Sequence, residues 1–138
     1  MVDASVLVGE LLRQRGRALL ANDGLEVFGA EQVMSETRYE IRRRLGRMTR
    51  LTPDQQQSLL RDCEQVLKAC VVECLEKEYG LWEAIARERV PRDPNDWPTV
   101  ALALRLGADI WTQDADFLGC GIPTWTTGTL LVHLERGD

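Results

Sequence analysis

Short apolar runs alternate along the chain with longer segments in which apolar residues recur every three or four positions. The short runs predict buried strands, and the periodic segments predict amphipathic helices. We expect an apolar first stretch that holds Val2 and residues 6–8, followed by strands at 25–30, 71–74, 109–112 and 122–126. We expect helices at 10–22, 31–47, 52–69, 79–88, 96–106 and 127–134. This alternation indicates a single α/β domain over residues 1–138, a three-layer α/β/α sandwich whose mostly parallel central sheet has about five strands.

Two of these helices have recognisable starts. Thr52 is followed by Pro53 and, three positions after the threonine, by Gln55, which is the pattern of a capping box with proline in the first turn. Asp96 stands directly before an apolar helical segment and is well placed as an N-cap. Asp93, which precedes a proline, is more typical of a turn residue than of a metal ligand.

Composition adds several exclusions. The 138 residues are 44% hydrophobic and 28% charged, an ordinary globular balance. We expect no membrane association and a cytoplasmic location, because no apolar run approaches the roughly 20 residues of a membrane span and the first residues lack a basic signal region. The four cysteines form no CxxC pair, which favours buried thiols over a zinc site.

Charge is distributed unevenly. The net charge is −5, yet the segment 36–50 holds six arginines and only two glutamates. A solvated face with local ion pairs is one interpretation of this helix. The other is that Arg38 or Arg42 binds nucleic-acid phosphates, for which the guanidinium fork is suited.

Acidic residues follow the predicted strands or begin the adjoining helices. Ligands of parallel sheets collect beyond the carboxyl ends of the strands, so these residues are expected to converge there: Asp3, Glu36, Asp96, Asp114 and Asp116, together with Thr112. Clustered carboxylates repel one another unless they are protonated or bind a cation. Oxygen ligands without histidine or cysteine favour Mg²⁺ or Mn²⁺, and such ions support hydrolysis of phosphodiesters.

The order and spacing of four motifs resemble the PIN-domain family over almost the whole chain. They are Val2-Asp3-Ala4-Ser5-Val6-Leu7-Val8, Ser35-Glu36, Asp96 followed by Ala101-Leu102-Ala103-Leu104, and Ile110-Trp111-Thr112-Gln113-Asp114-Ala115-Asp116-Phe117. One departure is the short first strand, since only Met1 and Val2 precede the first aspartate.

The resemblance implies a Mg²⁺- or Mn²⁺-dependent endoribonuclease acting on single-stranded RNA, in many bacterial relatives the toxin of a VapC-type toxin–antitoxin pair. It implies Asp3, Glu36, Asp96 and Asp114 as catalytic residues, with Asp3, Asp96 and Asp114 holding the metal. Thr112 and Asp116 are implied as auxiliary residues. An antitoxin and a second copy of the chain are the protein partners that the resemblance implies.

Two alternatives remain at this point. The short first strand leaves open a catalytically weak or inactive PIN-like module that binds RNA or a protein partner. A phosphatase of the haloacid-dehalogenase type is disfavoured, because it needs an Asp-x-Asp and here Asp3 is followed by Ala4-Ser5. The sequence does not fix the RNA target, the number of metal ions or the oligomeric state.

Overall fold

The strands form two small parallel sheets. In the computed structural model, which describes residues 1–137, β1 (Val27–Ala30) pairs with β2 (Val71–Cys74), and Val27 lies opposite Val71. The second sheet joins β3 (Ile110–Trp111) to β4 (Thr124–Trp125). These four strands confirm the predicted positions and the parallel direction, although β1, β3 and β4 are shorter than expected. The α/β class is correct.

A continuous central sheet of about five strands is not confirmed, because the named strands of the described residues form two sheets of two strands each. The first strand is reduced to Val2, which forms an isolated parallel bridge with Trp111. The Val2 amide donates to the Phe28 carbonyl at 3.1 Å, and the Asp3 amide donates to the Trp111 carbonyl at 3.3 Å. Val2 thus connects the two sheets by hydrogen bonds on both sides. The helix begins too soon after Val2 for a longer strand to form.

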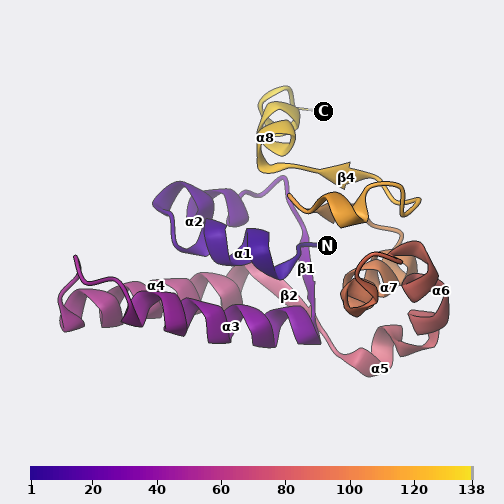
Figure 1. Ribbon diagram of the computed structural model, residues 1–138. Helices are drawn as coiled ribbons and strands as arrows, with labels where there is room; N and C mark the ends of the chain where they lie inside the picture. The colour runs from indigo at the N-terminus through magenta and orange to yellow at the C-terminus, as the bar shows by residue number, and fades with distance from the viewer. Residues whose placement is uncertain (138) are drawn as a thin grey trace.

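Helices make up most of the remaining fold (Figure 1). The α-helices are α1 (Ala4–Leu11), α2 (Gln14–Leu20), α3 (Glu31–Gly46), α4 (Pro53–Cys70), α5 (Glu76–Tyr79), α6 (Glu83–Arg89), α7 (Trp97–Leu106) and α8 (Thr127–Glu135). Three short 3-10 helices are η1 (Gly80–Trp82), η2 (Pro94–Asp96) and η3 (Ala115–Phe117). Figure 1 shows α3 beside α4 in one part of the molecule and α5 to α7 together in another.

The start of α4 has the hydrogen bonds that the sequence predicts. The amide of Gln55 donates to Thr52 Oγ1 at 3.1 Å, and the amide of Thr52 donates to Gln55 Oε1 at 2.8 Å, which confirms the capping box. Asp96 does stand at the N-cap of α7, but its side chain makes no capping hydrogen bond. Its carboxylate is therefore free for another role.

The single helix predicted over 10–22 is instead divided between α1 and α2. Asp3 caps α1, because its Oδ1 accepts a hydrogen bond from the Val6 amide at 2.8 Å, so the apolar residues 6–8 lie in a buried helix. A Cβ atom at Gly16 would lie 2.1 Å from the Glu10 carbonyl oxygen. Only glycine allows the start of α2 to pack so closely against the end of α1.

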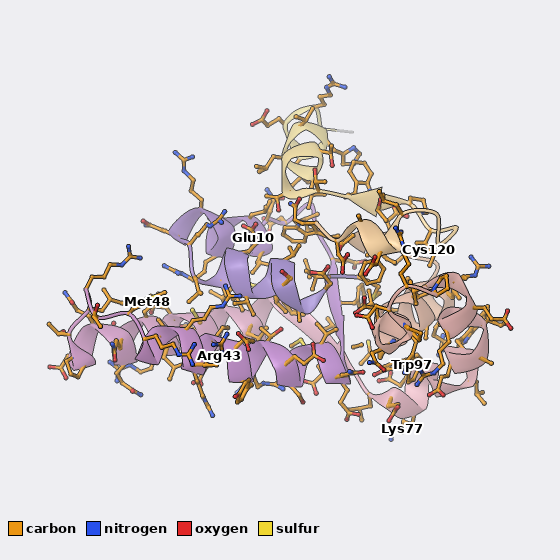
Figure 2. All side chains as sticks on the ribbon, viewed as in Figure 1. Glu10, Arg43, Met48, Lys77, Trp97 and Cys120 are labelled. Carbon is orange, nitrogen blue, oxygen red and sulfur yellow. The ribbon has the colours of Figure 1, made fainter. Side chains whose placement is uncertain are left out.

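The core unites α1, α7 and the strands. Its fully buried members include Leu7, Leu11, Leu102 and Ile110. Tyr79 and Trp97 are also buried and pack ring against ring at 5.7 Å, and Figure 2 labels Trp97 at the start of α7. Among the described residues no helix is long and apolar enough to cross a membrane.

Candidate metal centre

Asp3 is fixed at the junction of Val2 and α1. Its Oδ1 caps the helix, while its Oδ2 accepts a hydrogen bond from the hydroxyl of Thr112. The side chain is buried, and burial raises the pKa of its carboxyl above the ordinary value, with the charge of Asp114 acting in the same direction. A carboxylate held at both oxygens, one by a backbone amide and one by a side-chain hydroxyl, is orientated before any ligand arrives.

Thr112 connects Asp3 to Asp114. Its hydroxyl donates to Asp3, and its Oγ1 accepts from the amide of Asp114 at 2.9 Å. Asp114 in turn caps η3, since its Oδ1 accepts from the amide of Asp116 at 2.9 Å. The end of β3 therefore places a threonine and two aspartates in one continuous chain of hydrogen bonds with Asp3.

Asp96 contributes an unpaired buried oxygen. Within residues 1–137, its Oδ2 is the one buried side-chain oxygen or nitrogen without a hydrogen-bond partner. Burial, followed by the charges of Asp93, Asp114, Asp3 and Asp116, raises the pKa of Asp96 from 3.8 to about 7. An orphaned carboxylate oxygen is costly unless a cation or a proton satisfies it.

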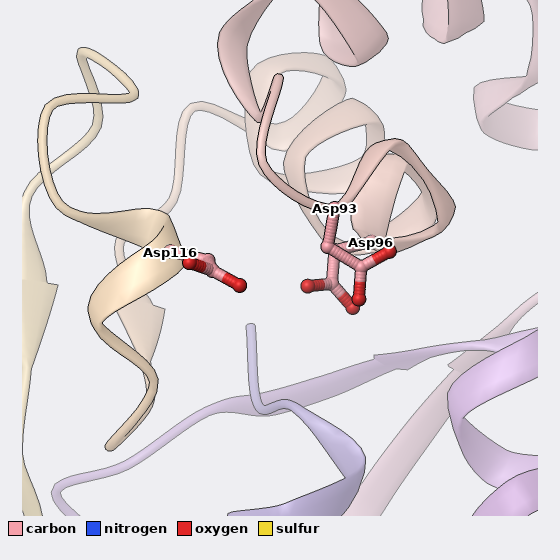
Figure 3. A group of neighbouring side chains, drawn as sticks. All are labelled: Asp93, Asp96 and Asp116. Atoms are coloured by element: carbon pink, nitrogen blue, oxygen red, sulfur yellow. The ribbon is translucent and has the colours of Figure 1, made fainter.

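Asp93 and Asp116 complete an acidic group around Asp96. One carboxylate oxygen from each of the three residues lies within 4.8 Å of the other two. Figure 3 shows Asp93 and Asp96 side by side at the start of α7, with Asp116 directed toward them from η3. Two turns that are distant in the sequence thus present their carboxylates to the same space.

A model of the PIN domain matches residues 1–135. The chain belongs to the PIN-domain family. PIN domains are generally nucleases and typically depend on a divalent metal ion. A search of curated proteins finds no match.

The acidic residues of this PIN domain fit a divalent cation. Every donor in the group is a carboxylate oxygen, the kind of ligand that Mg²⁺ and Mn²⁺ prefer. The unpartnered Oδ2 of Asp96 and the raised pKa values of Asp3 and Asp96 reflect burial first and the nearby carboxylate charges second, and a cation would offset both costs. The donor set is consistent with a metal centre.

Of the residues that the sequence predicted for the site, five lie together. They are Asp3, Asp96, Asp114, Asp116 and the hydroxyl of Thr112, as the contacts above describe. Glu36 belongs neither to this chain of hydrogen bonds nor to the acidic group around Asp96. Its Oε1 accepts a hydrogen bond from Gln32 at 3.1 Å, one turn earlier in α3, and its side chain lines a hollow of about 320 Å³ between α3 and α1.

The two arginines that the sequence proposed for nucleic acid are engaged in ion pairs. Arg38 contacts Glu73 at 2.6 Å, and Arg42 contacts Glu64 at 2.9 Å. Both side chains remain largely exposed, as a solvated face predicts, but their partners lie in β2 and α4 rather than on the same helix. The local pairs on α3 are those of Glu40 with Arg43 and Arg44. Phosphate binding by either arginine stays a prediction.

Asp93 is the acidic residue that sequence reasoning set aside. The turn interpretation was right as far as it went, because Asp93 Oδ1 accepts from the Asn95 amide at 3.2 Å and caps η2. The same side chain also belongs to the acidic group with Asp96 and Asp116. The spacing of three between Asp93 and Asp96 was the available signal, since one short turn brings such residues onto the same side.

Proposed function

We propose that this PIN domain is an endoribonuclease that hydrolyses phosphodiester bonds of single-stranded RNA with Mg²⁺ or Mn²⁺. The observation that supports the proposal most strongly is the unpartnered Oδ2 of Asp96 within a group of carboxylates from three separate parts of the chain. The choice of RNA rests on the family resemblance of the motifs. The choice of metal rests on the all-oxygen donor set.

Asp3, Asp96 and Asp114 are the residues that we assign to holding the metal. Asp3 and Asp114 keep their positions through Thr112, whose hydroxyl and oxygen link them. When bound, the divalent ion supplies charge neutralisation at the scissile phosphate and lowers the pKa of the attacking water. Asp116 serves as an auxiliary residue beside Asp96, where its carboxylate lies close enough to the same space to add to metal binding and to orientate that water.

Glu36 keeps a catalytic assignment only as part of this proposal. Its side chain lines a hollow together with Ala4, the first residue of α1 and the residue after Asp3. A change of the Glu36 rotamer, without movement of the backbone, would therefore change the distance between its carboxylate and Asp3. In the present arrangement its carboxylate accepts from Gln32.

A second candidate function is a catalytically weak or inactive PIN domain that binds RNA or a protein partner. Two observations favour it: the first strand is reduced to Val2, and the Glu36 carboxylate is engaged by Gln32 and not by the hydrogen bonds that join the aspartates. Cation binding distinguishes the two functions, because the binding module does not require it.

The remaining elements of the proposal concern partners and location. If the protein is a toxin, its expected partner is an antitoxin. The arginine-bearing face of α3 is a surface that an acidic segment of such a partner could contact. A homodimer is part of the same proposal. The four cysteines are free thiols, which fits a reducing compartment such as the cytoplasm.

Titration of Mn²⁺ by calorimetry tests the proposal without a choice of RNA. We expect wild-type protein to bind Mn²⁺ and Asp96→Asn to bind at least about tenfold more weakly, or about 1.4 kcal/mol. Asp62→Asn, on the exposed part of α4, is the matched control and should bind as wild type does. Absence of binding by wild type would remove the metal-dependent function and leave the binding module.

Cleavage of unstructured RNA in Mn²⁺ then separates a nuclease from a metal-binding module. We expect cleavage by wild type and by Asp62→Asn, and none by Asp96→Asn. Cleavage at the wild-type rate by Asp96→Asn would exclude Asp96 from the mechanism.

A further inference from the structure

Asp116 approaches Asp93 and Asp96 from a separate turn, and three carboxylates placed so close repel one another. The two turns belong to the segment 83–96, which leads into α7, and to the loop 113–121, which follows β3. Something must hold these two parts together against that repulsion. Buried residues of both parts, Val90 and Phe117 among them, belong to the shared core, and polar side chains add contacts that cross between the two parts.

Two arginines supply the hydrogen bonds that cross this boundary within the described residues. Arg92 Nη2 donates to the Ala115 carbonyl at 2.8 Å, and Arg89 Nη1 donates to the Cys120 carbonyl at 3.0 Å. Arg92 Nε also lies 3.4 Å from Asp116 Oδ1. Figure 2 labels Cys120, which lies in the loop beside α6 and α7.

The two contacts differ in what they fix. Arg89 attaches the far end of the loop, where Gly121 leaves it room, since a Cβ at that position would lie 2.6 Å from Arg89 Nη1. Arg92 attaches the near end, and it binds both the backbone and the carboxylate of adjacent residues. Its guanidinium therefore sets the position of Ala115 and the direction of the Asp116 side chain at once.

We propose that Arg92 is a positioning residue that holds Asp116 against Asp93 and Asp96 and thereby strengthens divalent-metal binding. This inference rests on the proposed metal-dependent function. Arg92 precedes Asp93 directly, so one short stretch of chain carries both a carboxylate of the group and the cation that fixes the opposite one.

The shape of the guanidinium matters more here than its charge. The side chains of the Arg92–Asp116 pair are 59% and 33% exposed, and a single exposed ion pair contributes little. A planar fork with several donors can engage two acceptors in fixed directions, whereas a lysine ammonium acts as a point charge. The positive charge by itself opposes the approach of a metal cation, so a contribution in favour of binding has to come from geometry.

Arg92→Lys separates geometry from charge, because the cation is retained and the fork is lost. We expect calorimetric titration of Mn²⁺ to give about fivefold weaker binding for Arg92→Lys than for wild type, or about 1 kcal/mol. The matched control is Arg89→Lys, which disturbs the same loop at its far end and should bind within about twofold of wild type. Melting of the metal-free proteins should give Tm values for the two variants within about 2 °C of each other.

Each other result would overturn the inference. Wild-type affinity or tighter binding in Arg92→Lys would show that the fork does not position Asp116. Equal losses in Arg89→Lys and Arg92→Lys, or a lower metal-free Tm confined to Arg92→Lys, would assign these arginines a general structural role. Failure of wild type to bind Mn²⁺ would remove the proposed function as well, and that result is distinguishable from the other three.

Discussion

The free energy of unfolding should reveal the strain that the acidic group places on the metal-free protein. The pKa of Asp96 is raised from 3.8 to about 7, chiefly by burial and then by four neighbouring aspartates. The folded state therefore retains a proton on Asp96 at a pH where the unfolded state has lost it. Stability falls as pH rises from about 4 to about 7, and the cost is complete above the folded-state pKa.

Asp96→Asn removes this cost, because the amide has the shape of the protonated acid and carries no charge. A shift of about three units would amount to about 4 kcal/mol for a fully buried group. Asp96 is only partly buried, so screening by solvent reduces this to about 1–2 kcal/mol. We expect the metal-free variant to be more stable than wild type by that amount at pH 8 and to differ by less than about 0.5 kcal/mol at pH 4.

Urea unfolding in the presence of a chelator, at intervals between pH 4 and pH 8, measures both proteins. Asp62→Asn, with an exposed carboxylate on α4, controls for the loss of one negative charge and should follow wild type across the range. Mn²⁺ should remove most of the difference at pH 8, since a ligand at a hundred times its Kd stabilises wild type by about 2.7 kcal/mol and a tenfold weaker binder by only about 1.4 kcal/mol. A constant difference between Asp96→Asn and wild type from pH 4 to pH 8 would refute the reasoning.

Three further changes test the surroundings of the site. Thr112→Val removes the hydroxyl that links Asp3 and Asp114 and leaves buried polar groups unpaired. We expect the free energy of unfolding in urea to fall by about 1–3 kcal/mol and Mn²⁺ binding to weaken. Unchanged stability would contradict the role of this hydroxyl. Gly16→Ala places a methyl group against a carbonyl of α1 and should lower the free energy of unfolding by more than about 2 kcal/mol. Gly9→Ala, which has open space around it, should be neutral or slightly stabilising. Equal effects of the two variants in thermal melts would argue against close packing of α1 on α2. Glu36→Gln should change Mn²⁺ affinity by less than about twofold, because this carboxylate lies outside the aspartate group, and a tenfold loss would place it among the ligands.

The positions of the strands and the acidic residues beside them were accessible from the sequence. Asp114 and Thr112 follow a short apolar run directly, and any residue in that position reaches the carboxyl edge of a parallel strand. Asp3 was accessible for the same reason. The length of the first strand was not, because Asp3 caps α1 and the residues after it are as apolar in a buried helix as they would be in a strand.

Side-chain direction is the part that the sequence did not determine. Glu36 lies on the expected helix, yet the rotation of α3 and a hydrogen bond from Gln32 decide where its carboxylate lies. Asp93 was interpreted as a turn residue, which is correct, although a carboxylate that caps a turn with one oxygen still has the other available. Arg92 gave no signal at all, since its two acceptors lie more than twenty residues away in the sequence.

The bridge between Val2 and Trp111 has a consequence for biosynthesis. The residue that joins the two sheets is made at the beginning of translation, and its partner is made 109 residues later. Asp3 acquires its hydrogen bond from Thr112 at the same late moment. While the chain is still on the ribosome and shorter than this, the helices of the first half can form from local contacts, but the aspartates have no common site. The nascent protein therefore cannot assemble the acidic site before the ribosome has passed Thr112, so this site appears only after most of the polypeptide has been made.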